Sequence, residues 1–169
     1  MAENYPVQLL ALDVDGVLTD GSILIDDDGR ETKRFNVKDG LAITTWLRLG
    51  LHVGIITRRA GKAVEHRMRE LGVRHVVQGC KDKSAGMTKL AADCGVPLSA
   101  SAFIGDDWPD LPAMRIVGFP IVVADGAPEL KAIAKFVTVT RGGRGAVREA
   151  VEHLLALNGL REQAVAAFA

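Results

Sequence analysis

The sequence lacks the features that would place a protein in a membrane or in an oxidising compartment. It has only two cysteines, Cys80 and Cys94, which are too few for a disulfide framework and do not have the spacing of a zinc site. Residues 1–6 contain no cluster of positive charge, and the apolar run at residues 7–12 is too short for a signal sequence or a membrane span. We therefore expect a cytoplasmic protein with free thiols and no membrane partner.

The chain also lacks an excess of charge of either sign. Its 21 lysine and arginine residues balance 21 aspartate and glutamate residues. This balance gives no support for a nucleic-acid partner, and it removes the repulsion between copies that would oppose self-association. There is no internal repeat, low-complexity tract or linker, and 48% of the 169 residues are hydrophobic, so we expect one globular domain over residues 1–169.

One stretch joins an apolar run, Leu9–Leu12, directly to Asp13 and Asp15. A continuous apolar run is typical of a strand that is buried on both faces of a parallel sheet. Ligands bind beyond the carboxyl ends of such strands, where two neighbouring carboxylates need a cation or a shared proton. Gly16 allows the chain to turn sharply. The stretch fits either a metal-assisted phosphoryl-transfer site or an ordinary strand that enters an Asp-Gly turn.

Strands and helices alternate along the rest of the chain. Further strands are expected at residues 52–57, 75–77, 101–105, 120–123 and 136–140. Helices are expected at residues 39–48 with Asp39 as the N-cap, at 60–71, at 82–94, from Pro128 onward and at 146–157. This alternation predicts an α/β fold with a mainly parallel sheet that is flanked by helices. Only a β-hairpin at residues 22–35 and a tail at residues 158–169 lie outside it.

Polar side chains follow the expected strands at the points where the strands end. They are Asp13, Asp15, Thr57, Asp106 and Asp107, with Lys83 after a fourth strand. Because the carboxyl ends of parallel strands meet at one edge of a sheet, we expect these side chains to converge. Attack by a carboxylate on a phosphate dianion brings like charges together, so a site of this kind must also supply positive charge.

These residue types predict a division of roles. Asp13 would be the nucleophile and form an aspartyl-phosphate, and Mg²⁺ would be held by the carboxylates of Asp13 and Asp106 and the main-chain carbonyl of Asp15. Lys83 and Thr57 would bind the phosphate oxygens. Asp15 would protonate the leaving alcohol and later deprotonate water, helped by adjacent carboxylates and partial burial. The remaining carboxylates of this segment, Asp107 and Asp110, would orient Lys83 or metal-bound water.

At these positions the chain resembles the haloacid dehalogenase superfamily. The matching residues are the DxDG of residues 13–16, Thr57, Lys83 and the GDDxxD of residues 105–110. The resemblance implies a Rossmann-like fold, Mg²⁺ and the roles described above. Residues 12–21, 35–40, 78–79 and 142–149 resemble the 3-deoxy-D-manno-octulosonate 8-phosphate phosphatase family. That family implies a phosphorylated sugar-acid substrate, lipopolysaccharide biosynthesis, no large cap domain, and a homotetramer whose hairpins assemble centrally and whose neighbouring subunits help cover each site.

The spacing of the motifs agrees with the absence of a cap, since too few residues separate Thr57 from Lys83 for an inserted domain. The glycine-rich segment Gly142–Gly145 would be either a mobile cover or a loop that leads into the next helix. A sugar-acid carboxylate calls for arginine, and Arg59, Arg67 and Arg144 are the candidates. Two features depart from the family pattern: Arg58, where the family usually has glycine, and Trp108-Pro109. Both bear on the exact substrate.

Three alternatives remain open. The substrate would instead be a related nine-carbon sugar-acid 9-phosphate, or the chain would be a receiver-like phosphoacceptor domain, or an inactive scaffold. A receiver places its phosphorylated aspartate after a later strand, where this chain has Thr57, and Asp15 offers the acid/base that hydrolysis needs.

Overall fold

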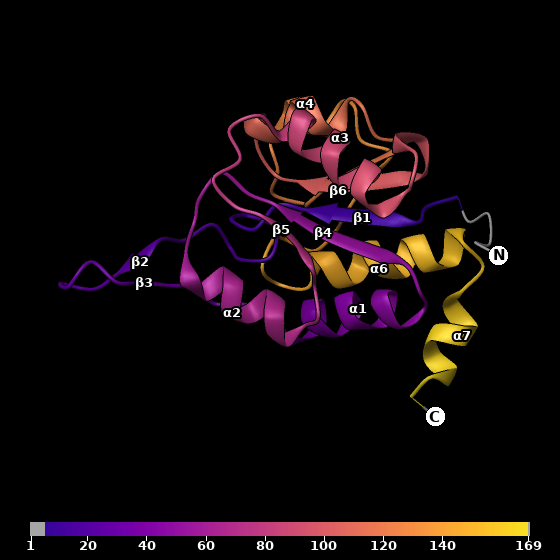
Figure 1. The fold of residues 1–169 in the computed structure, drawn as a ribbon, viewed down its shortest axis with the longest axis horizontal. Coiled ribbons are helices and arrows are strands. Elements are labelled where there is room, and N and C mark those ends of the chain that lie inside the picture. The colour runs from indigo at the N-terminus through magenta and orange to yellow at the C-terminus, as the bar shows by residue number, and fades with distance from the viewer. Residues whose placement is uncertain (1–5, 169) are drawn as a thin grey trace.

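The computed structural model describes residues 6–168. Residues 1–5, part of the segment that is not expected to be a signal sequence, lie outside the described residues. Its centre is a six-stranded, wholly parallel sheet in the order β5-β4-β1-β6-β7-β8 (Figure 1). The strands are β1 (Leu9–Leu12), β4 (His52–Ile56), β5 (His75–Val77), β6 (Ser101–Gly105), β7 (Phe119–Val122) and β8 (Phe136–Val137). The predicted α/β architecture is confirmed.

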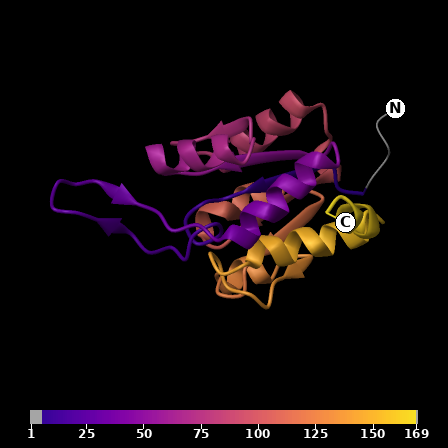
Figure 2. The same cartoon turned by 90° about the horizontal axis from the view of Figure 1, so that it is seen from below.

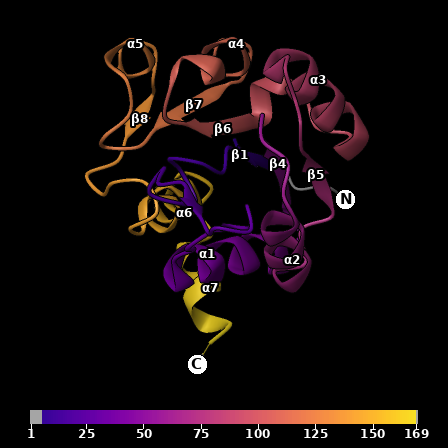
Figure 3. The same cartoon turned by 90° about the vertical axis from the view of Figure 1, so that its left-hand side faces the viewer.

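Helices cover both faces of this sheet. They are α1 (Val37–Arg48), α2 (Lys62–Glu70), α3 (Lys83–Cys94), α4 (Leu111–Met114), α5 (Pro128–Lys131), α6 (Ala146–Leu157) and α7 (Arg161–Ala166), with single 3₁₀ turns at Leu98–Ala100 and Trp108–Asp110. Helices α1, α2 and α6 lie on one face, and α3, α4 and α5 on the other (Figure 3). No helix in the described part of the chain is long and apolar enough to span a membrane.

Strand β1 shows why the apolar run is unbroken. Leu10 and Leu12 pack in the core beneath α1 and α6, whereas Leu9 and Ala11 pack in the core beneath α3 and α4. Successive side chains of a strand point to opposite faces, and here both faces are covered by helices. All four residues of the strand are therefore buried and apolar.

The predicted hairpin is present and extends away from the body. Strands β2 (Leu24–Ile25) and β3 (Glu31–Thr32) pair antiparallel, and they leave the molecule at the end where β1 terminates (Figures 1 and 2). Ile23, Leu24 and Ile25 are 51–61% exposed, which leaves an uncovered apolar strip on the hairpin.

Three predicted boundaries are wrong. The N-cap of α1 is Asn36, whose side chain accepts a hydrogen bond from the backbone N–H of Lys38 at 2.8 Å. Asp39 instead accepts from the backbone N–H of Arg148 at 2.8 Å and so caps the start of α6, where Gly145 has no side chain to do so.

The strand expected at residues 136–140 ends at Val137. The hydroxyl of Thr138 donates to the carbonyl of Thr140 and accepts from the backbone N–H of Ala124, which turns the chain out of the sheet. The expected tail contains α7, because Ala164 buries its methyl group against the core beside α6.

Candidate active site

The carboxyl ends of the three central strands form one cleft of about 540 Å³. Asp13 follows β1, Thr57 follows β4 and Asp106 follows β6, and these strands are direct neighbours. The lining residues are Asp13, Asp15, Gly21, Thr57, Arg58, Arg59, Lys83, Asp106, Asp107, Pro109 and Asp110. The structure thus brings together every strand-end residue that the sequence singled out.

Lys83 is the buried cation of this cleft. It is the first residue of α3, and the Asp82 side chain caps that helix by accepting from two backbone N–H groups. Its Nζ lies 2.7 Å from Oδ2 of Asp13 and 2.5 Å from Oδ1 of Asp110. Burial opposes the charge, but the two carboxylates outweigh it and raise the pKa of Lys83. The site therefore holds a permanent positive charge beside Asp13.

Asp110 fixes the loop that carries Asp106. Its second oxygen, Oδ2, accepts from the backbone N–H groups of Asp106 at 2.9 Å and Asp107 at 3.4 Å. Asp110 is 1% exposed, and both of its oxygens are engaged within the protein. Asp110 thus lies between Lys83 and the Asp106 loop, whereas the carboxylate of Asp107 accepts from the backbone N–H of Trp108.

Asp13 and Asp106 have strongly perturbed acidities. Burial and repulsion from Asp110, opposed by Lys83, raise the pKa of Asp13 to about 6. Burial and repulsion from Asp110 and Asp13 raise the pKa of Asp106 to about 8. Lys83 is already shared by two other carboxylates, and Asp106 forms no ion pair within residues 6–168. The Asp106 carboxylate is therefore the group that most needs another cation.

The cleft suits a hard divalent cation. Five carboxylates and three cationic side chains line it, a formal charge of −2. Carboxylate oxygens of Asp13, Asp106 and Asp110 lie within 4.8 Å of one another. A Cβ at Gly16, where φ is +87°, would overlap the Asp106 carboxylate. Mg²⁺ prefers a few carboxylate oxygens, with water completing its octahedral coordination. Asp13 and Asp106 fit this preference, whereas Asp110 is already paired with Lys83.

Asp15 lies at the base of the hairpin and faces cations. Oδ1 of Asp15 is 2.5 Å from Nζ of Lys33, and Oδ2 is 3.7 Å from Nε of Arg59. Glu31 completes the cluster, since it is 2.8 Å from Lys33 and 3.0 Å from Arg59. The adjacent carboxylates expected for Asp15 line the same cleft, but its ion pairs within residues 6–168 are with Lys33 and Arg59.

Sequence reasoning missed Lys33 and Glu31. Lys33 has a side chain only 3% exposed, and its hydrogen bonds to Asp15 and Glu31 outweigh its burial and raise its pKa. Glu31 is in β3 and Lys33 follows the end of that strand, two residues further on, and both side chains reach Asp15 or its partner Arg59. That spacing was the available signal, but it does not reveal which way the side chains turn.

The three candidate arginines lie in different surroundings. Arg59 lines the cleft. Arg67, on α2, pairs with Glu70 at 2.8 Å, packs against Gly40 of α1 and does not line the cleft. Arg144 also lies outside the lining set and is 3.3 Å from Asp20, which pairs with Arg34 as well.

The glycine-rich segment packs against the first active-site turn of its own chain. The backbone N–H of Gly143 donates to the carbonyl of Val17 at 2.9 Å, and a Cβ at Gly142 would overlap the carbonyl of Gly16. Gly145 then directly precedes α6. This packing supports a loop that leads into the helix rather than a mobile cover.

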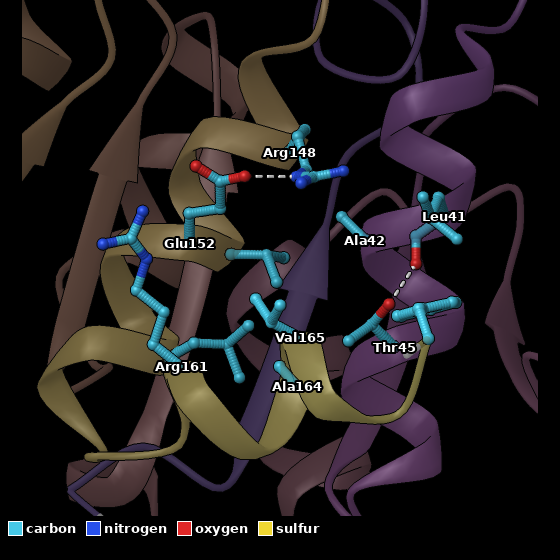
Figure 4. A pocket seen from close by; sticks show the side chains of 11 residues that line it. Leu41, Ala42, Thr45, Arg148, Glu152, Arg161, Ala164 and Val165 are labelled. Carbon is cyan, nitrogen blue, oxygen red and sulfur yellow. Dashed lines mark hydrogen bonds and ion pairs between the residues drawn. The ribbon is translucent and has the colours of Figure 1, made fainter.

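A second pocket, of about 280 Å³, lies between α1, α6 and α7 and shares no residue with the cleft (Figure 4). Its walls are mostly apolar, including Ala42, Ala164 and Val165. Arg148 and Glu152 pair with each other at its rim at 2.5 Å.

The fold and the strand-end site together define a phosphohydrolase of the haloacid dehalogenase type. Residues 72–151 match the family model described as haloacid dehalogenase-like hydrolase. The 3-deoxy-D-manno-octulosonate 8-phosphate phosphatase KdsC of Escherichia coli K12 is 43% identical over 163 residues, which cover 96% of this chain and 86% of that protein. The chain belongs to the family of 3-deoxy-D-manno-octulosonate 8-phosphate phosphatases.

Solved structures of the family share the whole fold. The crystal structure of the phosphatase from Moraxella catarrhalis, in complex with magnesium ion, phosphate ion and KDO, matches with a TM-score of 0.94 and 40% identity. The match covers 98% of this chain and 95% of that one. The cobalt-bound phosphatase from Haemophilus influenzae matches with a TM-score of 0.91 and 32% identity, over 95% of this chain and 96% of that one.

Proposed function

We propose that this chain is a Mg²⁺-dependent phosphatase that converts 3-deoxy-D-manno-octulosonate 8-phosphate to the free sugar acid and inorganic phosphate. One observation carries the chemistry: Lys83 is held between Asp13 and Asp110 on the wall of a cleft that Thr57 and Asp106 also line. A carboxylate nucleophile, a fixed ammonium and a hydroxyl donor stand together where a phosphate group would enter.

The residues of the chain divide the work of binding. Bound Mg²⁺, held by the carboxylates of Asp13 and Asp106 and the main-chain carbonyl of Asp15, would neutralise a phosphoryl oxygen and keep Asp13 ionised. The ammonium of Lys83 and the hydroxyl of Thr57 would bind the other phosphoryl oxygens. Asp110 holds Lys83 and the Asp106 loop in place for this task.

Two displacements at phosphorus complete the reaction. Asp13 attacks phosphorus, the bond from phosphorus to the sugar oxygen breaks, and Asp15 gives a proton to that oxygen. Asp15 then takes a proton from water, the water attacks phosphorus, and the acyl-phosphate bond breaks to release phosphate and restore Asp13. Since the Asp15 carboxylate is paired with Lys33 in this structure, Asp15 would take up a proton from solvent and exchange Lys33 for the leaving oxygen when substrate binds.

A substrate panel tests the proposal. Phosphate release is measured from 3-deoxy-D-manno-octulosonate 8-phosphate, a nine-carbon sugar-acid 9-phosphate, glucose 6-phosphate and p-nitrophenyl phosphate, each with Mg²⁺ and with chelator. We expect the highest kcat/KM for the eight-carbon substrate, loss of activity in chelator, and recovery when Mg²⁺ is returned. Preference for the nine-carbon compound would reassign the substrate, and activity that persists in chelator would reject the metal.

We further propose a cytoplasmic homotetramer that assembles through the hairpins. The exposed strip Ile23–Ile25 supports this, because apolar side chains that project from the body gain by burial against other copies. A neighbouring subunit would also help to exclude water from the open cleft. Sedimentation equilibrium should give a tetramer for the wild type and smaller species for Leu24→Ser/Ile25→Ser, and a wild-type monomer would reject this assembly.

A further inference from the structure

The cationic side chains of the cleft differ in how far they are already neutralised. Lys83 is paired with Asp13 and Asp110, and Arg59 is paired with Glu31. Arg58 lines the same cleft, is exposed, and forms no ion pair or side-chain hydrogen bond within residues 6–168. Its guanidinium is thus the cleft's available positive charge.

The proposed substrate has more negative charge than the rest of the cleft would balance. Without Arg58 the lining residues carry a formal charge of −3, from five carboxylates against Lys83 and Arg59, so one divalent ion would leave −1. The phosphomonoester then adds a dianion, and the sugar acid adds a carboxylate at the far end of its carbon chain. A further cation is therefore needed for the carboxylate, and arginine recognises carboxylates through two parallel hydrogen bonds.

Arg58 directly follows the residue that would bind the phosphate. This residue is Thr57, which is buried at the end of β4. Arg58 is exposed and lines the same cleft, so its long side chain is free to reach a part of the substrate beyond the phosphate. Arg59, the adjacent cation, is held by Glu31 at 3.0 Å and lies near Asp15 at the hairpin base.

We infer that Arg58 binds the substrate carboxylate and thereby selects sugar-acid phosphates over neutral sugar phosphates. This role rests on the proposed function, and it assigns the selectivity to one residue at the end of β4.

Arg58→Gln tests the assignment, with Arg69→Gln as the matched control. Arg69 is an exposed arginine of α2 that does not line the cleft, so the control makes the same change of charge elsewhere. With 3-deoxy-D-manno-octulosonate 8-phosphate we expect Arg58→Gln to raise KM about 10- to 100-fold, the loss typical of a charged hydrogen-bonded partner, with kcat nearly unchanged. With glucose 6-phosphate it should change KM less than about 3-fold, and inhibition by the free sugar acid should weaken in parallel.

Each other outcome overturns the inference. An equal loss with both substrates would assign Arg58 to the phosphate, and no loss with either would make it an ordinary solvated side chain. If the wild type and Arg58→Gln both prefer the sugar-acid phosphate to the same degree, the role of Arg58 is rejected but the proposed substrate is not. A wild type that prefers glucose 6-phosphate rejects the proposed substrate, and this role for Arg58 with it.

Discussion

The ammonium nitrogen of Lys83 lies 2.7 Å from Oδ2 of Asp13, and both residues are buried. Lys83 also holds Asp110, so removing the ammonium leaves two buried carboxylates without their cation. We expect Lys83→Met to lower the free energy of unfolding by about 3–5 kcal/mol in chelator and to lose most activity.

Lys89→Met is the matched control for this change. Lys89 is on the same helix and pairs with Asp93 at 2.5 Å, but its side chain is 72% exposed. Its loss should cost less than about 1 kcal/mol in the same urea titration. Equal stability of the two variants would contradict the account of Lys83 as the counter-charge of the site.

Gly16 is needed because the Asp106 carboxylate occupies the space where a Cβ would lie. Gly16→Ala should displace that carboxylate and weaken Mg²⁺ activation of catalysis about 10- to 100-fold. Gly29→Ala in the hairpin is the control, since Gly29 has a similar φ of +77° but no atom within 4 Å of the added Cβ. If the two variants need the same Mg²⁺ concentration for half-maximal activity, the contact between residue 16 and Asp106 has no role in metal binding.

The stability of the metal-free protein should depend on pH. Folding raises the pKa of Asp13 to about 6 and that of Asp106 to about 8, both from 3.8. The folded state therefore binds more protons than the unfolded chain, and stability falls as the pH rises from about 4 to about 8. Mg²⁺ replaces these protons, so its stabilising effect should grow over the same range.

Thermal unfolding between pH 5 and pH 8.5, with chelator and with Mg²⁺, checks this dependence. The Tm in chelator should decrease with pH, and Asp106→Asn should flatten the upper part of the curve. A Tm in chelator that rises steadily to pH 8 would contradict the raised pKa values of Asp13 and Asp106.

Asp15→Asn should slow both half-reactions, because Asp15 is proposed as the acid in the first and the base in the second. We expect kcat to fall about 10²- to 10⁴-fold with the protein still folded. Single-turnover kinetics would separate formation of the phosphoenzyme from its hydrolysis. A normal rate in either step would remove Asp15 from that step.

The parts of the fold that follow from local pattern were predictable. A strand covered on both faces has to be apolar throughout, so the run Leu9–Leu12 identifies β1. The first polar side chain after each such strand marks the carboxyl-terminal end of the strands in the sheet. Convergence of Asp13, Thr57 and Asp106 then follows from parallel topology alone.

The parts that depend on contacts between distant segments were not predictable. Asp39 stands in the first turn of α1, but its carboxylate caps α6, which begins more than 100 residues later. Lys33 reaches Asp15 only because the hairpin folds back at its base, and nothing in the spacing of the two residues specifies that direction. Helix α7 depends in the same way on burial of Ala164 against the core.

The central claim is that Asp13 is the nucleophile that takes the phosphoryl group from the substrate. The most direct measurement is rapid acid quench of the Mg²⁺-loaded Asp15→Asn variant with 3-deoxy-D-manno-octulosonate 8-phosphate, followed by mass spectrometry of its peptides. Because the second displacement is slowed in this variant, a phosphoryl group should be found on Asp13 and should be absent when Asp13 is also changed to Asn. Product formation with no phosphoryl group on Asp13, or the group on another residue, would contradict the account.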